Sequence, residues 1–125
     1  MIVEHRIWTE ESPRRVRVVF AGETIVDSTR ARLLHETGIP PVHYFPTSDV
    51  RTELLERSDH RSVCPFKGEA SYWTIAVDGR RAEAAVWGYE DPLPERADIK
   101  DHVAFYPERV DDWLEDEGKP ESEEG

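Results

Sequence analysis

The segment from Tyr72 to Tyr89 constrains the fold most, because two β-like runs flank the dipeptide Asp78-Gly79. Aspartate and glycine tolerate the positive φ angles that a two-residue type I′ turn needs between antiparallel strands. The pattern therefore predicts a β-hairpin. Its simplest register gives two central cross-strand pairs, Trp73 with Ala84 and Ile75 with Ala82. A β-bulge would shift this register.

The two faces of this predicted hairpin differ in composition. One face is apolar and is expected to lie against the core: Trp73, Ile75, Val77, Ala82, Ala84 and Val86. The other face mixes large aromatic residues with polar ones: Tyr72, Thr74, Glu83, Trp87 and Tyr89. This mixture is typical of a ligand-binding cleft, although aromatic residues half-covered by a neighbouring loop give the same pattern.

A first hairpin is predicted closer to the N-terminus. Arg15–Phe20 alternates polar and apolar residues, and the turn Ala21–Glu23 joins it to a second strand at Thr24–Asp27. Ala31–Glu36 contains helix formers but is short and is followed by Gly38, so a helix and a short strand fit it equally well.

Prolines and capping residues indicate the remaining elements. Val42–Phe45 is predicted to be a strand that ends at Pro46. Thr47 or Ser48 is expected to cap a short helix that runs to about Leu55. The C-terminal part is expected to consist of a strand and a closing segment, Val103–Tyr106 and Arg109–Leu114.

We therefore predict a mainly β fold, a compact single domain of antiparallel hairpins with one short helix. A chain of 125 residues suits one hydrophobic core. The expected organisation is an N-terminal extension at 1–12, the β domain at 13–114 and a disordered acidic tail at 115–125. The stretch 111–125 holds eight acidic residues and one lysine.

Composition argues against several partners. A net charge of −11 opposes broad binding to a phosphate backbone, so nucleic acid is not expected as a partner. Charged residues occupy the N-terminus where a signal peptide needs an apolar run, and no stretch approaches the roughly 18 apolar residues of a membrane span. We expect a cytoplasmic protein with no membrane partner.

Metal and cofactor sites are not expected either. Cys64 is the single cysteine, which rules out an internal disulfide and a site of several thiolates. The five histidines form no pair at positions i and i+4. The sequence contains no P-loop and no dinucleotide-binding fingerprint.

A series of short motifs resembles the DUF427 family. They run in the family's order over roughly Pro13 to Leu114, and the most specific is Cys64-Pro65-x-Lys67-Gly68 followed by Tyr72. The other motifs are Arg15–Val18, Gly22-Glu23, Asp27-Ser28, Tyr44–Pro46, Asp49-Val50, Trp87-x-Tyr89 and Val103–Tyr106. His43 is a departure, since the family often has an aromatic residue there.

The resemblance implies a compact, mostly β domain similar in topology to the Mss4-like or β-tent folds. Proteins of those folds often bind a structural zinc with two pairs of cysteines, which this chain lacks, so we expect packing to hold the sheets together. The family has no assigned activity, although a nucleotidyltransferase label is sometimes attached to it. That chemistry needs two carboxylates on one side of a strand, and the sequence contains no such pair.

Candidate site residues gather around the predicted second hairpin. Lys67, beside Gly68, could reach an anionic group or act as a nucleophile. The alternative is a surface lysine paired with Glu69 or Glu90, and the extended register places it opposite Glu90. The Tyr72 hydroxyl could donate to a ligand or serve as a weak acid, with Trp87 beside it in an aromatic wall.

Other candidates have simpler alternatives. Cys64 has no base nearby in sequence and fits a buried structural thiol, although Lys67 would favour its thiolate. Glu23, Asp27 and Arg30 cluster around the first hairpin, where a buried Glu23 would be the best general-base candidate. Carboxylates beside hairpin turns are more often simply solvated.

We expect a small-molecule-binding domain for an anionic metabolite, and the sequence leaves open whether it is an enzyme. The candidate catalytic residues are Lys67, Tyr72 and Glu23. The candidate ligand-binding residues are Cys64, Gly68, Trp87, Tyr89 and Arg30. The alternative is a non-catalytic interaction module, whose aromatic face meets a protein partner or a second copy of the chain.

Overall fold

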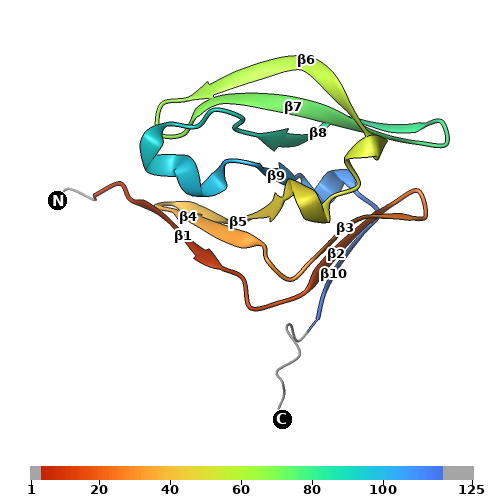
Figure 1. Cartoon of the computed structure of the whole chain (residues 1–125), viewed down its shortest axis with the longest axis horizontal. Helices are drawn as coiled ribbons and strands as arrows, with labels where there is room; N and C mark the ends of the chain where they lie inside the picture. The colour runs from red at the N-terminus through yellow and green to blue at the C-terminus, as the bar shows by residue number, and fades with distance from the viewer. Residues whose placement is uncertain (1–3, 117–125) are drawn as a thin grey trace, which may run out of the picture.

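The computed structural model describes residues 4–116, and their fold is mainly β, as predicted (Figure 1). The larger antiparallel sheet has the strand order β1 (Ile7–Glu11), β4 (Arg32–Glu36), β5 (Ile39–Pro46), β9 (His102–Phe105), β8 (Arg80–Gly88), β7 (Gly68–Val77), β6 (Leu55–Cys64). The smaller sheet has the order β10 (Asp112–Glu115), β2 (Val16–Phe20), β3 (Glu23–Ser28). Short 3-10 turns join the strands: η1 (Thr47–Asp49), η2 (Thr52–Leu54), η3 (Pro94–Ile99) and η4 (Pro107–Arg109).

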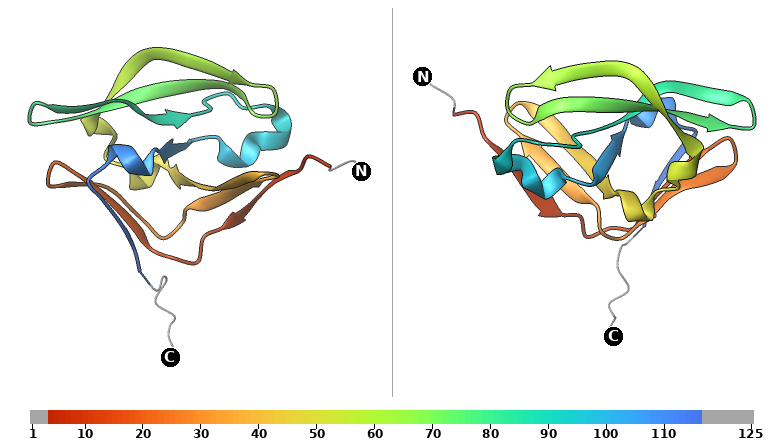
Figure 2. Two further views of the ribbon diagram at one scale, coloured as in Figure 1. Left: turned by 180° about the vertical axis from the view of Figure 1, so that it is seen from behind. Right: turned by 45° about the horizontal axis from the view of Figure 1, so that its top comes forward.

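The seven-stranded sheet bends over on itself. Strands β6, β7 and β8 form an upper layer, β1, β4 and β5 a lower one, and β9 lies between them (Figure 1, Figure 2). The β5–β9 pairing includes Phe45 with Val103, and the β8–β9 pairing includes Val86 with Phe105. Each pairing covers only two residue pairs, so β9 is a narrow connection between the two layers.

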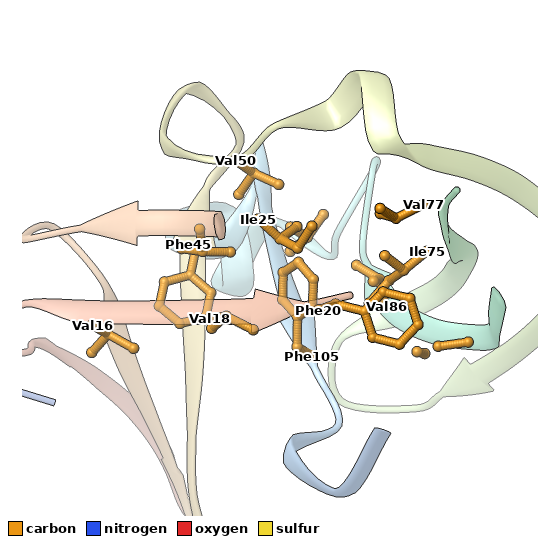
Figure 3. Packing of buried hydrophobic residues seen from close by; sticks show 14 of the residues in the cluster. Val16, Val18, Phe20, Ile25, Phe45, Val50, Ile75, Val77, Val86 and Phe105 are labelled. Atoms are coloured by element: carbon orange, nitrogen blue, oxygen red, sulfur yellow. The ribbon is translucent and has the colours of Figure 1, made fainter. Parts of the chain in front are cut away.

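Alternation along β5 and β9 divides the interior into two cores. Phe45 and Phe105 point into the larger core, whereas their neighbours Tyr44 and Ala104 point into a smaller one. The larger core lies between the smaller sheet and β7–β8, and includes Val16, Val18, Phe20, Ile25, Val50, Ile75, Val77 and Val86 (Figure 3). The smaller core contains Leu34, Tyr44, Ala70, Tyr72, Tyr89, Ile99 and Ala104.

The first hairpin is confirmed. Strands β2 and β3 pair, and the turn between them places Ala21 and Gly22 at positive φ. Val16, Val18 and Phe20 are buried, as the alternation predicts. The ambiguous segment after this hairpin is the strand β4.

The second hairpin is also confirmed, with a correction to its register. Asp78 and Gly79 both have positive φ, and Ile75 pairs with Ala82 as predicted. Beyond that pair a β-bulge shifts the register, so Trp73 faces Val86 and not Ala84. Ala84 itself has a φ of 50°, and its N–H donates to the side chain of Thr74.

The bulge also moves Ala84 to a different core. The sequence pattern placed it on the apolar face with Ile75, but it packs against the smaller core. Thr74 is buried on that side of the hairpin and supplies the hydroxyl that accepts the Ala84 N–H at 3.1 Å.

The helix expected from Thr47 takes the form of the two turns η1 and η2, and neither has a side-chain cap. Instead of capping, Asp49 accepts hydrogen bonds from Ser28 and Arg30. Val50 then forms a β-bridge with Val26, which keeps the backbone extended between the two turns.

The chain ends differ in what the structure describes. Residues 7–11, within the expected N-terminal extension, form the edge strand β1, which pairs with β4. The expected disordered tail at 115–125 lies outside the described residues, except for Glu115 and Asp116. Within residues 4–116 no helix is long and apolar enough to cross a membrane.

The larger core yields a stability prediction. Phe105→Ala is expected to lower the free energy of unfolding by about 3–5 kcal/mol, because it leaves a cavity where a fully buried ring packs. Val63→Ala is the control, since Val63 is 76 % exposed on β6, and it should change that energy by no more than about 0.5 kcal/mol. Urea unfolding followed by tryptophan fluorescence measures both, and similar losses would contradict the assignment of this core.

Candidate functional site

A buried ion pair joins the two layers of the bent sheet. Lys67 lies in the turn between β6 and β7, and Glu36 is the last residue of β4. The Lys67 Nζ lies 2.9 Å from Glu36 Oε1, and only 10 and 11 % of the two side chains is exposed. The pair therefore holds the end of the domain where the β6–β7 and β4–β5 turns meet (Figure 1).

The local backbone directs Lys67 toward this partner. Cys64 pairs with Gly68 at the end of the hairpin, and the Lys67 N–H donates to the Cys64 carbonyl at 3.1 Å. Gly68 has a φ of 121°, a conformation that residues with a Cβ rarely adopt. The Lys67 carbonyl accepts the N–H of Leu93 at 2.8 Å, which fixes the turn against the loop before η3.

The predicted pairing of Lys67 with Glu90 is wrong. That prediction extended the strand register through Lys67, but Lys67 belongs to the turn and not to a strand. Glu90 instead accepts hydrogen bonds from Arg57 at 2.7 Å and from Ser71 at 2.9 Å.

The Glu36 carboxylate is held in its charged form. Burial would raise its pKa, but hydrogen bonds from Lys67 and His5 outweigh this effect and hold the pKa below its usual value. The His5 Nε2 lies 3.0 Å from Glu36 Oε2, and the His5 ring packs against Phe66 at an angle of 31°. Glu36 thus ties the segment before β1 to the turn that carries Lys67.

A cavity of about 250 Å³ opens beside this ion pair. It lies between β4–β5 and β7–β8, and all four tyrosines of the chain line it. Its polar and aromatic lining consists of Glu36, Lys67, Trp87, Tyr44, Tyr72, Tyr89 and Tyr106. We call it the tyrosine cavity.

The hydroxyls of the tyrosine cavity are donors. Burial raises the pKa of Tyr44 and Tyr89 above the ordinary value, and it also raises the pKa of Tyr106. These groups therefore remain protonated at neutral pH. Trp87 Nε1 donates to the Tyr44 oxygen at 3.2 Å, which leaves the Tyr44 proton free to donate. The Tyr89 hydroxyl has no hydrogen-bond partner among residues 4–116.

Most of the predicted site residues converge here. Lys67, Tyr72, Trp87 and Tyr89 line the tyrosine cavity. Cys64 lies next to it, with its Sγ 3.5 Å from Lys67 Nζ. Gly68 contributes through the backbone of the turn.

Glu23 and Arg30 are not part of the tyrosine cavity. Glu23 lies on the smaller sheet, pairs with Arg51 at 2.6 Å and is 42 % exposed, so it lacks the burial assumed for a general base. Arg30 pairs with Asp49 at 2.9 Å, and Asp27 pairs with Arg15. These charges therefore form surface ion pairs.

Sequence analysis missed three residues of this site. Tyr44 and Tyr106 belong to motifs that carry the family resemblance, and that membership was the available signal. Glu36 ends a segment whose secondary structure was ambiguous, and its partner is 31 residues away in sequence. Among the described residues, no group of three or more His, Cys, Asp and Glu side chains could hold a metal ion.

Comparison with known families adds one finding. The model of a family described as a domain of unknown function (DUF427) matches residues 8–116. No curated protein matches the chain.

Glu36→Gln is expected to lower the free energy of unfolding by about 3 kcal/mol at neutral pH, because Lys67 would remain buried without a counter-charge. The pKa of Glu36 is lower in the folded chain than in the unfolded chain. The stabilisation that the charged Glu36 provides is therefore complete above about pH 4.3, the pKa of glutamate in the unfolded chain. It is lost as the pH falls through the lower pKa that Glu36 has in the folded chain. The difference between wild type and variant should shrink accordingly in urea titrations between about pH 7 and about pH 3.

Glu53→Gln is the matched control for an exposed ion pair, since Glu53 pairs with Arg51 on the surface. It is expected to lose far less stability than Glu36→Gln. An equal loss, or a Glu36→Gln effect that grows in acid, would contradict the buried pair.

Proposed function

Because this chain belongs to the family described as a domain of unknown function (DUF427), we propose its function from the geometry of its site. The proposed function is to bind a small molecule that has a flat apolar body and one negatively charged group. One observation carries this proposal: hydrogen-bond donors and aromatic walls converge on the tyrosine cavity beside a buried lysine.

Lys67 has the capacity for a ligand contact. Its ammonium has three N–H donors, of which one points to Glu36 at 2.9 Å and one to the Cys64 sulfur at 3.5 Å. A third donor is left for an acceptor group in the cavity. The protons of Tyr44 and Tyr89 supply further donors in the same lining.

The charge balance favours a carboxylate over a phosphate. Glu36 already neutralises Lys67, so a ligand with two negative charges would bury a large uncompensated charge. A carboxylate brings one charge and accepts several hydrogen bonds. The walls of Trp87 and the tyrosines suit a flat apolar body, and about 250 Å³ limits it to a small one.

The predicted residues that lie at or beside the tyrosine cavity then have roles in binding. Lys67 holds the anionic group, and Trp87 and Tyr89 form the wall. Tyr72 is positioned by Ser62, whose Oγ lies 2.9 Å from the Tyr72 hydroxyl. Cys64 and Gly68 shape the turn that directs Lys67 into the cavity.

The proposal also covers the fold relationship, the cellular location and the C-terminal residues of the chain. An Mss4-like or β-tent relationship is supported by the antiparallel sheets. A cytoplasmic location is supported by the free thiol of Cys64. The acidic character of the C-terminal residues is supported by their composition alone.

A protein partner is the second candidate. Two exposed apolar side chains, Val63 and Phe66, precede Lys67 in sequence, and Ile39 lines the cavity while half-exposed. A partner that covered these residues would also close the cavity.

The binding proposal is tested with a panel of aromatic monocarboxylates, the corresponding amides and the corresponding phosphate monoesters. The carboxylates are expected to raise the melting temperature by several degrees when present well above the dissociation constant. Amides and phosphates should give smaller shifts. If no compound of the panel raises the melting temperature, the small-molecule proposal is rejected and the protein partner is favoured.

Variants locate the binding. Lys67→Met should abolish the carboxylate shift, whereas Lys100→Met, at an exposed lysine, should leave it unchanged. Tyr89→Phe keeps the ring and removes one donor, so affinity by calorimetry should fall about tenfold. This variant separates binding from folding if Lys67→Met is unstable. Wild-type affinity in Tyr89→Phe and Lys67→Met would overturn the site.

A further inference from the structure

A second cavity, of about 370 Å³, lies between the turns η1 and η2, the start of β6, the middle of β7, the end of β8 and the start of β9. Its polar and aromatic lining includes Thr47, Thr52, Trp73, Glu90, Asp101 and His102. We call it the Asp101 cavity. Of its lining residues, the sequence had indicated only Tyr89 as a ligand-binding candidate.

The acidic side chains in the lining of the Asp101 cavity accept hydrogen bonds. Glu90 and Asp101 contribute carboxylates, and among the described lining residues there is no lysine or arginine. His102 Nδ1 lies 2.8 Å from the Lys100 carbonyl. Because a carbonyl oxygen can only accept, Nδ1 carries the proton, and Nε2 of the neutral ring is an acceptor.

Arg57 shows that this region holds a cation. Its guanidinium lies 5.2 Å from the centroid of the Trp73 ring and forms two hydrogen bonds with Glu90, at 3.2 and 2.7 Å. An aromatic face and a carboxylate together are a recognised arrangement for binding a cation. The chain's own guanidinium thus satisfies one of the two carboxylates that line the cavity.

Asp101 is the second carboxylate of the lining, and Arg57 does not pair with it. Its side chain forms no hydrogen bond or ion pair with any residue in the range 4–116, although its backbone is fixed. The Asp101 carbonyl accepts the Thr47 N–H at 2.9 Å, and its φ is 63°, a strained value for a residue with a Cβ. The cavity therefore has in its lining one carboxylate without an ion pair among residues 4–116, and the next residue in sequence is His102.

We propose that the Asp101 cavity binds a small organic ammonium ion. Asp101 and His102 Nε2 accept its N–H donors, and the Trp73 side of the cavity takes its apolar part. The net charge of −11 attracts such a cation over a longer range. Tyr89 lines both cavities, but this site binds its ligand through Asp101, whereas the proposed carboxylate site binds its ligand through Lys67.

The absence of a side chain at position 88 keeps this part of the sheet closely packed. A Cβ on Gly88 would lie 2.8 Å from the His102 carbonyl oxygen and 3.6 Å from the Trp73 ring. Gly88 therefore allows β8 to approach the start of β9 and leaves the cavity lined by Trp73 and His102.

The test uses 2-phenylethylamine as the probe and neutral 2-phenylethanol as its matched control, both titrated into the full chain and followed by calorimetry and amide NMR shifts. The amine is expected to bind and to shift the resonances of Trp73 and His102, and the alcohol is expected not to bind. Equal binding of both probes, no binding of the amine, or shifts confined to other residues would overturn the proposal.

Asp101→Asn tests the charge without disturbing the backbone, because asparagine tolerates a positive φ. It should weaken amine binding at least tenfold. Asp112→Asn, on the surface of β10, is the matched control and should bind the amine as wild type does. Wild-type affinity in Asp101→Asn would overturn the assignment.

Discussion

The ion pair between Lys67 and Glu36 is the interaction on which the arrangement of the two layers depends. The layers are otherwise connected within the sheet through β9, which pairs over only two residues on each side. Away from β9, the turn between β6 and β7 meets the end of β4 through the ion pair of Lys67 with Glu36. Two charges out of water are costly unless they are paired, so neither residue can lose its partner without a large loss of stability.

The pair also shapes the tyrosine cavity. Glu36 and Lys67 form one end of it, while alternation along β5 and β7 supplies Tyr44 and Tyr72 to its walls. The carboxylate of Glu36 neutralises the ammonium and leaves it one free donor. The proposed preference of the cavity for a singly charged ligand rests on this contact.

The two cavities have opposite hydrogen-bonding character. The tyrosine cavity offers donors from Lys67 and the tyrosine hydroxyls, whereas the Asp101 cavity offers acceptors from Asp101 and His102. Both lie along the end of β8, because the segment that includes Tyr89 contributes to each lining. The segment around Tyr89 thus lies between the two cavities and contributes to the lining of both.

Local patterns predicted most of the fold, and contacts distant in sequence account for the errors. Alternation and the Asp78-Gly79 turn identified both hairpins, but the bulge at Ala84 depends on a hydrogen bond from its N–H to Thr74 across the strand. The family motif pointed to Lys67, yet its partner Glu36 lies on a different hairpin. Glu23 was a general-base candidate only if buried, and in the fold it lies on the smaller sheet, exposed and paired with Arg51.

The measurement that tests this account most directly is a double-mutant cycle on the ion pair. The free energies of unfolding of wild type, Lys67→Met, Glu36→Gln and the double variant give the coupling between the two side chains. The account predicts a coupling of about 2 kcal/mol or more, because both groups are buried. A coupling below about 0.5 kcal/mol, as for an exposed pair, would show that this contact does not hold the layers together.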